Sequence, residues 1–327
     1  MNRRQLLAGA PALLLAPAAL AQGEGRWTPN RTVTITVPFA AGGPTDLIAR
    51  LLAEIMGREL GQTVVVENVS GAGGTIAAGR VAQARPDGHT LLIHHIGHAA
   101  SATLYRRLPY DVQESFTPLG LVSETPMTIV ARPDFPAADL KGLLEEIRRK
   151  GTALNLSHSG LGGSNHLCGT LLQAAAGAAV TTVAFRGSAP ANTELMAGRI
   201  DLACEQATNS VPFLREKRMK AYAVTAPRRV PGIEDVPTTA EAGLPGFEIT
   251  VWHALYGPRG LPDEVTRRLS AAIQVAMQDE KLRNRYAELV TDPVSAEKAT
   301  PEFHRRFLAE EVARWRPLIQ AAGQYAD

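Results

Sequence analysis

Hydrophobic and polar residues follow two different periods near the start of the chain. Val33, Ile35 and Val37 occupy every second position, which is the spacing of a strand. Over residues 47–56 the apolar residues recur three and four positions apart, which is the spacing of an amphipathic helix. Pro38 and a pair of glycines lie between the two segments. The pattern therefore predicts a strand, a glycine turn and a helix over residues 32–56.

The same succession returns twice in the second half of the chain. One copy has a strand over residues 153–156 and a helix over residues 164–176, which Ser164 or Asn165 is suited to cap. The other has a strand over residues 180–185 and a helix over residues 191–197. Strands are also expected over residues 63–67, 90–93, 119–122, 127–131, 200–203, 221–225 and 248–256, and helices over residues 75–84, 140–150 and 301–322 and from residues 262 and 279. Alternating strands and helices predict an α/β fold with parallel sheets, which bind ligands at the carboxyl ends of their strands.

The glycine turn before the first helix has the chemistry of an anion site. Gly42 and Gly43 allow backbone N–H groups to face one point, and the helix that follows adds its own free N–H groups. Pro44 suits the first helical turn, and Asp46 places a carboxylate there. Two interpretations stay open: an anion cradle, and a structural turn in which Asp46 is only a cap. A phosphate-binding loop is not indicated, because no Gly-Lys-Ser or Gly-Lys-Thr follows the glycines.

Length and charge narrow the classes of function. A chain of 327 residues is long for one core and predicts two lobes. Its 34 Lys and Arg residues against 32 Asp and Glu residues leave a net charge of +2. Basic and aromatic residues are not interleaved in any segment, so nucleic-acid binding is not expected.

Residues 1–21 have the features of an export signal. A basic start, a short apolar stretch and a small-residue ending predict cleavage after Ala21. The stretch contains two prolines and is shorter than the ~20 residues that span a bilayer. The Arg3-Arg4 pair leaves the twin-arginine route open beside the general secretory route. The mature protein is expected to be soluble and outside the cytoplasm.

Cysteine and histidine are the residues most suited to a metal site. The sequence has two cysteines, Cys168 and Cys204, and an even number in an oxidising compartment favours a disulfide; two buried thiols remain the alternative. His94, His95 and His98 follow a strand, with no carboxylate at the spacing of known metal motifs. Polar residues that line a cleft are therefore favoured over metal ligands.

Catalytic motifs do not stand out in the sequence. Residues 157–160 lack the Gly-x-Ser-x-Gly frame of a nucleophile elbow. Asp46 is far in sequence from Asp201 and Glu205, and the sequence marks no pair of carboxylates for acid and base catalysis. Binding without turnover is the simpler hypothesis.

Several motifs, taken in order, resemble those of one family. They are residues 37–46, 64–68, 71–74, 86–92, 108–111, 186–190, 235–238 and 241–246. They resemble the extracytoplasmic solute-binding receptors of tripartite tricarboxylate transporters, many of which are called Bug receptors, over essentially the whole mature chain. The resemblance implies a two-lobed periplasmic-binding fold of the second type, in which mixed, mainly parallel sheets are flanked by helices and a hinge joins the lobes. After a signal peptide at residues 1–21, the expected lobes are residues 22–125 plus 226–327, and residues 126–225.

The resemblance also implies a function and a site. Such a receptor closes on a small carboxylated solute and delivers it to the membrane subunits of the transporter, and we expect a periplasmic monomer without cofactor or metal. The family holds the carboxylate through backbone N–H groups, hydroxyls and waters. The corresponding residues are Phe39, Ala41, Gly42, Gly43, Thr45 and Asp46 on one lobe, and Ser157, Ser159, Ser164, Asn165, Arg186, Gly187, Ser188 and Ala189 on the other.

Some positions depart from the family pattern. His94 and His95 stand where a small polar residue is frequent, and Glu205 stands where Asp is common. We expect His94, His95 and Glu205 to border the distal end of the pocket, so the ligand of a relative cannot be assigned to this chain. Dicarboxylates, tricarboxylates, acidic amino acids and aromatic acids are all compatible, and neutral ligands stay open. The pair of Cys168 and Cys204 looks like a trait of one subgroup of the family, which supports a disulfide between them. Two other functions stay open: an exported hydrolase that uses a cleft histidine, and a receptor that presents its ligand to a sensor.

Overall fold

The strands form one mixed sheet that extends through both lobes. A computed structural model describes residues 27–323, 325 and 326, so the predicted export signal lies outside the described residues. The strands are β1 (Val33–Val37), β2 (Val64–Asn68), β3 (Thr90–His95), β4 (Phe116–Ala131), β5 (Asn155–His158), β6 (Thr181–Ala184), β7 (Leu202–Gln206), β8 (Lys220–Val224) and β9 (Thr250–Pro258). Their order is β2-β1-β3-β9-β4-β7-β5-β6, with β8 paired to β4. The first three strands are parallel to one another, as are β5, β6 and β7, whereas β4 and β9 are antiparallel to their neighbours. The predicted α/β class with mixed sheets is confirmed.

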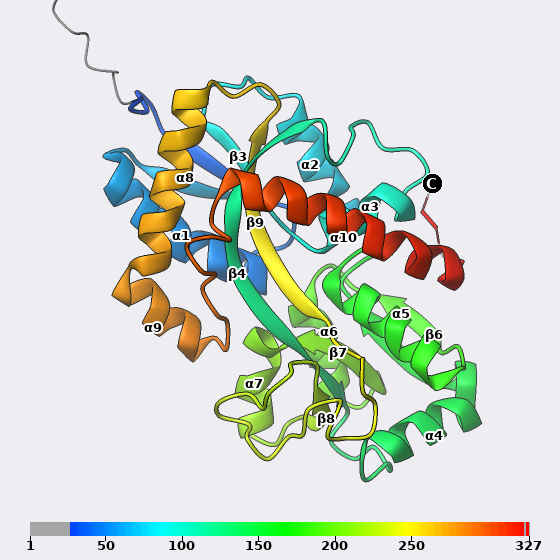
Figure 1. Cartoon of the computed structure of the whole chain (residues 1–327). Helices are drawn as coiled ribbons and strands as arrows, with labels where there is room; N and C mark the ends of the chain where they lie inside the picture. Colours follow the sequence, from blue (N-terminus) through cyan, green and yellow to red (C-terminus); the bar gives the residue numbers. More distant parts are fainter. Residues whose placement is uncertain (1–26, 324, 327) are drawn as a thin grey trace, which may run out of the picture.

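Helices cover the sheet in both lobes. They are α1 (Pro44–Leu60), α2 (Thr75–Ala82), α3 (Gly97–Leu104), α4 (Leu140–Lys150), α5 (Ser164–Ala176), α6 (Ser188–Met196), α7 (Ala207–Arg215), α8 (Asp263–Gln278), α9 (Glu280–Glu288) and α10 (Pro301–Ala322), with short 3₁₀ helices at Ala72–Gly74 and Gly151–Ala153. Helices α1, α2, α3, α8, α9 and α10 surround the first lobe, and α4 to α7 surround the second (Figure 1). None of the helices formed by the described residues is long and apolar enough to cross a membrane.

The core of the first lobe lies between the sheet and its long helices. Ile35 and Leu92 of the sheet, Leu52 of α1, Ile273 of α8 and Trp315 of α10 are each at most 2% exposed and belong to one hydrophobic cluster. Full burial of a side chain of this size stabilises the fold by about 1.5–3 kcal/mol. Helices α8 and α10, from the last part of the chain, therefore complete the lobe that the first part of the chain begins.

Strand β4 corrects one expectation. Two strands were expected, over residues 119–122 and 127–131, with a break at residues 123–126, but β4 is continuous over 16 residues. Two polar residues of the expected break, Ser123 and Thr125, are buried within the strand, where each has a buried hydrogen-bond partner. Ser123 hydrogen-bonds His253 and Thr125 hydrogen-bonds Thr291.

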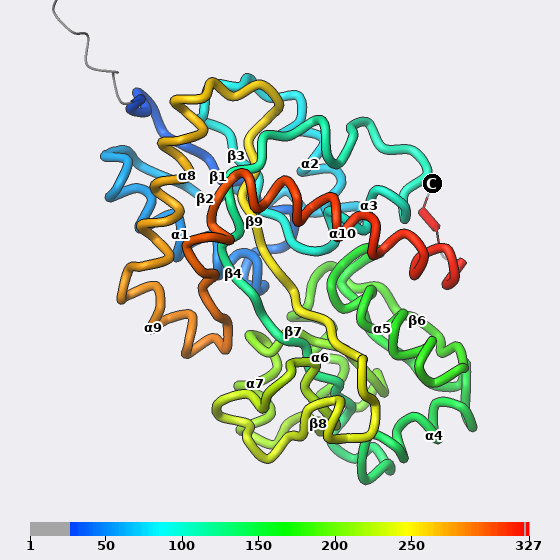
Figure 2. The backbone as a smooth tube through the Cα atoms, in the orientation of Figure 1, coloured from blue at the N-terminus to red at the C-terminus, as the bar shows by residue number. Residues whose placement is uncertain are grey.

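The chain passes between the lobes along β4 and returns along β9, as the tube in Figure 2 shows. In the segment before β9, Val230, Ile233 and Val236 pack with Ala207 and Val211 of α7, in a cluster that also includes Val290 after α9. Thr225 also donates its hydroxyl to the carbonyl of Ile249. Segment 226–249 therefore packs on the second lobe before β9 begins.

Candidate functional site

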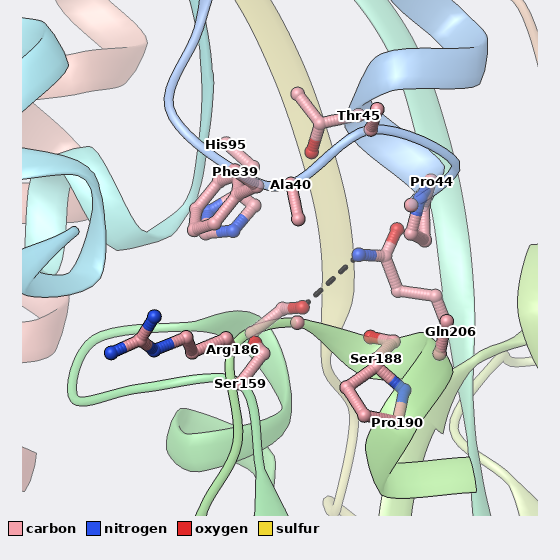
Figure 3. A pocket seen from close by; sticks show the side chains of 15 residues that line it. Phe39, Ala40, Pro44, Thr45, His95, Ser159, Arg186, Ser188, Pro190 and Gln206 are labelled. Atoms are coloured by element: carbon pink, nitrogen blue, oxygen red, sulfur yellow. Dashed lines mark hydrogen bonds between the residues drawn. The ribbon is translucent and has the colours of Figure 1, made fainter. Parts of the chain in front are cut away.

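A cavity lies between the two lobes, at the carboxyl ends of β1, β3, β5, β6 and β7 (Figure 3). Many of the predicted site residues line it: Phe39, Ala41, Gly43, Thr45, His95, Ser159, Ser164, Arg186, Gly187, Ser188 and Ala189. Sequence reasoning missed Ala40, Pro44, Pro190 and Gln206, which line it too. Gln206 is the last residue of β7, and its place at a strand end was a signal that could have identified it.

The other predicted residues lie outside the lining of this cavity. Asp46, Ser157, Asn165 and Glu205 are buried, each at most 3% exposed, and Gly42 lies on the exposed part of the first turn. Their hydrogen bonds show that several of them hold the residues that do form the wall.

Three helix N-termini meet at the cavity. Helices α1, α5 and α6 begin at Pro44, Ser164 and Ser188, and each of these residues lines it. The preceding residues are glycines without a side-chain cap, so the first N–H groups of each helix have no capping partner. Because the positive ends of three helix dipoles converge, the cavity favours a negative charge.

Two expectations about these helices are corrected. Neither Ser164 nor Asn165 caps α5, whose N-cap is Gly163. The Oδ1 atom of Asn165 instead accepts hydrogen bonds from the backbone N–H of Ser159, at 3.2 Å, and from its hydroxyl. Helix α6 begins at residue 188 and not at the expected residue 191, which brings Ser188 into its first turn. The amide of Asn165 therefore fixes the turn after β5.

Asp46 anchors the turn that precedes α1. Its Oδ2 atom accepts hydrogen bonds from the N–H of Gly42 and from Nε of Arg50, both at 2.9 Å, and its Oδ1 atom accepts one from Asn68 at 2.9 Å. Burial alone would raise the pKa of Asp46, but these hydrogen bonds hold it below its usual value. The N–H of Gly42 is thus used within the loop, and the amide of Asn68 also holds the carbonyl of Phe39.

His95 contributes a neutral ring to the wall of the first lobe. Its Nδ1 atom accepts the N–H of Gly97 at 2.8 Å, which leaves the ring proton on Nε2. The ring of Phe39 stacks on it with centroids 4.6 Å apart. Burial lowers the pKa of His95 to about 3, so the ring is an uncharged hydrogen-bond donor at neutral pH.

His253 lies behind the cavity wall of the first lobe and forms a hydrogen bond with the hydroxyl of Thr45. Its Nε2 atom lies 3.1 Å from Thr45 Oγ1, and its Nδ1 atom lies 3.0 Å from Ser123 Oγ. Burial lowers the pKa of His253 well below its usual value. A hydrolytic triad would place a carboxylate on the far ring nitrogen, whereas here that position is taken by a serine hydroxyl.

The wall of the second lobe contains a hydrogen-bond network that reaches the buried carboxyl group of Glu205. Nε2 of Gln206 donates to Ser164 Oγ at 3.1 Å, the bond dashed in Figure 3, and the Gln206 amide extends toward Pro44 of the first lobe. The hydroxyl of Ser188 donates to Glu205 Oε1 at 3.3 Å, and the N–H of Gln206 donates to the same oxygen at 2.8 Å. Burial raises the pKa of Glu205 to about 7.

Arg186 is the one lining residue with a permanent charge. It lines the cavity and also an adjoining hollow that is bordered by the glycine-rich residues 70–74. The side chain is exposed, and among the described residues it has no hydrogen-bond or ion-pair partner. Figure 3 shows it extending along the rim of the second lobe. It is therefore available to an anionic ligand.

The lobes touch at one edge of the cleft. Tyr105 of the first lobe donates its hydroxyl to the carbonyl of Leu161 in the second, at 3.1 Å. The approach is so close that a Cβ atom on Gly73 would lie 1.9 Å from that carbonyl oxygen, and one on Gly97 would lie 2.2 Å from the carbonyl oxygen of Gly162. Only glycine allows this contact, which closes the cleft on that side.

The predicted disulfide is confirmed. Cys168 of α5 and Cys204 of β7 are bonded, with both side chains fully buried and Cα atoms 5.8 Å apart. The bond joins the helix that begins with Ser164 to the strand that ends with Gln206. It therefore ties together two elements that line the cavity.

The histidines pack against one another in the interior of the first lobe. The ring of His94 lies 5.2 Å from that of His95 and 5.1 Å from that of His98, measured between centroids. In the described part of the chain no group of three or more His, Cys, Asp or Glu side chains has the geometry to hold a metal ion.

Comparison with known proteins gives consistent matches. The family model described as "Tripartite tricarboxylate transporter family receptor" matches residues 48–324. The UPF0065 protein in the TAR-I ttuE-ttuC' intergenic region of Agrobacterium vitis is 42% identical over 324 residues, which cover 99% of this chain and 93% of that protein. The structure of the periplasmic binding protein BugD has a TM-score of 0.87 at 41% identity and covers 91% of this chain and 100% of its own.

Two structures with bound ligands are also similar. MatC from Rhodopseudomonas palustris with bound malate has a TM-score of 0.86 at 41% identity, and covers 89% of this chain and 99% of its own. A second protein of that organism, with adipate, has a TM-score of 0.85 at 32% identity, and covers 90% of this chain and 98% of its own.

Proposed function

Because this chain belongs to the tripartite tricarboxylate transporter receptor family, we propose that it captures a small carboxylated solute in the cavity between its lobes. It delivers the solute, in the periplasm, to the membrane subunits of a tripartite transporter. The observation that carries the proposal is the convergence of the N-termini of α1, α5 and α6 on one cavity. Such helix ends bind carboxylates without any reacting group.

The charge and the donors of the cavity support an acidic solute. Free N–H groups of the first helical turns and the Nε2–H of His95 supply uncharged donors. Arg186 supplies a full positive charge toward the adjoining hollow. A solute with one carboxylate at the helix ends and a second acidic group near Arg186 uses both, and the malate and adipate of the two related structures have this form.

Closure of the lobes follows from the two strands that connect them. We propose a hinge where β4 passes residues 125 and 126, the boundary expected from the sequence. The second crossover was expected at residue 226, and we propose to place it near Thr250, because segment 226–249 packs with α7. The lobes would then be residues 22–125 plus 250–327, and residues 126–249.

A thermal-shift screen tests the receptor function. The mature protein is unfolded, refolded to remove any retained ligand, and heated with malate, adipate, citrate, aspartate or benzoate. An acid at a hundred times its dissociation constant adds about 2.7 kcal/mol, which raises the midpoint by about 4 °C for a chain of this size. The variant Arg186→Gln should reduce the shift, and Arg149→Gln, on α4 far from the cavity, should not.

Each outcome has a defined meaning. A shift with one acid, and unchanged acid after incubation, supports a receptor. Conversion of the acid to a product would favour the exported hydrolase. Binding without delivery to the membrane subunits, shown by partner capture, would favour a receptor for a sensor. The absence of a shift with every acid of the panel contradicts the proposal.

A further inference from the structure

Glu205 is a buried carboxyl group without a cation. It is 1% exposed, and its hydrogen bonds come from the N–H of Gln206 and the hydroxyl of Ser188. The side-chain amides of Asn165 and Asn192 also reach it. Among the residues that the structure describes, Lys, Arg and His form no ion pair with it. Because an unpaired buried charge is strongly unfavourable, this site favours the neutral carboxylic acid.

The hydrogen-bond partners of Glu205 act against its burial. The N–H of Gln206, the hydroxyl of Ser188 and the amides of Asn165 and Asn192 all donate, so by themselves they favour the carboxylate. Burial without a cation has the larger effect, and it favours the acid.

Glu205 is connected to the cavity through residues that line it. Ser188 and Gln206 each donate one hydrogen bond to Glu205 and face the cavity from the second lobe. The Oε1 atom of Gln206 is also buried and has no donor. If Glu205 were ionised, its negative charge would lie directly behind the wall against which an anionic solute binds. The two like charges would repel each other in a site of low dielectric constant.

We propose that the receptor binds its carboxylated solute together with one proton, which is held on Glu205. The inference rests on the proposed function and adds a second ligand to it. The step is a simple protonation, in which the carboxylate oxygen of Glu205 takes a proton from solvent and no covalent bond of the solute changes. Binding of the anion and binding of the proton strengthen each other, as linkage requires.

The pH at which this linkage appears follows from the environment of Glu205. Burial raises the pKa of Glu205 to about 7, so the free protein is already protonated below that pH. Above it, binding requires proton uptake, and the association constant falls up to tenfold per pH unit. At still higher pH the dependence ends, when the bound form also loses its proton.

The pKa values of three ionisable groups near the cavity, His95, His158 and Asp46, are shifted away from this range. The partners of Glu205 from α5, α6 and β7 are uncharged amides, a hydroxyl and a backbone N–H. Burial lowers the pKa of His95 to about 3 and also lowers that of His158 on β5. Hydrogen bonds hold the pKa of Asp46 on α1 below its usual value.

Calorimetric titration tests the inference. The panel acid that gives the largest thermal shift is titrated into the protein from pH 6 to pH 9, in two buffers with different ionisation enthalpies. For the native sequence we expect the association constant to fall about tenfold per unit above pH 7, and the measured heat to differ between buffers by the uptake of close to one proton. The variant Glu205→Gln should bind with a flat pH profile and no buffer dependence. The matched control Glu310→Gln, an exposed carboxylate on α10, should behave like the native protein.

A flat profile and equal heats in both buffers for the native protein would overturn the inference while leaving the receptor function intact. A Glu205→Gln variant that keeps the slope would assign the proton to another group. If the variant does not fold, the buffer dependence of the native protein decides alone. Failure of every acid to bind at any pH would remove the receptor function and this inference together.

Discussion

The disulfide between Cys168 and Cys204 should contribute a large part of the stability of the second lobe. The perturbation is the double variant Cys168→Ala and Cys204→Ala, which removes the bond and leaves the rest of the chain unchanged. The bond closes a loop with a sequence separation of 36 residues. That loop contains β6, α6 and the turn that carries Arg186.

The magnitude follows from loop closure. Cross-linking a loop of this length lowers the entropy of the unfolded chain enough to stabilise the fold by about 4 kcal/mol at 25 °C. Replacing two buried sulfurs by hydrogen adds about 1 kcal/mol for the space left in a packed interior. Because unfolding entropy is about 2.1 cal/mol/K per residue, a total loss of about 5 kcal/mol lowers the midpoint of a chain of about 300 residues by about 8 °C.

Differential scanning calorimetry of the mature protein measures this midpoint. The native protein is compared with the double variant, each with and without a reductant strong enough to act on the unfolded state. Reductant should lower the midpoint of the native protein by several degrees and leave that of the double variant unchanged. A difference of less than about 2 °C between the two oxidised proteins would refute the loop-closure reasoning. So would an equal response of both proteins to reductant.

Three further predictions concern single residues. Tyr105→Phe removes the hydrogen bond to Leu161 across the cleft, so solute should bind about two- to tenfold more weakly and dissociate faster in stopped-flow measurements; an unchanged dissociation rate would exclude a role in closure. Asp46→Ala leaves the N–H of Gly42 and its other donors unpaired, which should lower the free energy of unfolding by about 1–3 kcal/mol in urea titrations; stability equal to the native protein would contradict the anchoring role. The pKa of Glu205 rises from 4.5 to about 7 on folding, so the native state keeps a proton that the unfolded state releases. The protonated carboxyl group of Glu205 stabilises the native protein below pH 4.5, and about 3 kcal/mol of this stability is lost as the pH rises to about 7. Denaturation curves across that range should show this loss for the native protein and not for Glu205→Gln.

Local signals in the sequence are sufficient to predict most of the helices and most of the wall of the cavity, but not α3 and α7, which were not expected. Helix α10 has the predicted bounds, because Pro301 occupies its first turn and Thr300 caps it through the N–H of Phe303. The strand, turn and helix around Gly43 lie where the change of period predicts them. These features depend on neighbours within one or two turns, which a sequence displays directly.

Features that depend on distant partners could not be predicted from local patterns. The continuity of β4 through Ser123 depends on His253, which lies 130 residues further along the chain. Asp46 has the composition of a cap, yet its main partners include Asn68, which is 22 residues away. Glu205 was expected to border the pocket, but the hydrogen bond from Ser188 holds it behind the wall. Such roles are set by the three-dimensional neighbourhood and not by spacing.

The position of β9 between β3 and β4 has a consequence for the order in which the protein can fold. Leu92 of β3 pairs with Tyr256 of β9, and Thr125 of β4 pairs with Val251. A nascent chain that ends before Thr250 has already produced β1 to β8, but the edges of β3 and β4 are bare, and bare strand edges invite pairing with other chains. The first lobe is therefore completed only by the last quarter of the sequence, and no fragment from the N-terminal side contains a finished lobe one. We therefore expect the first lobe to fold only after the complete sequence, including β9, is available.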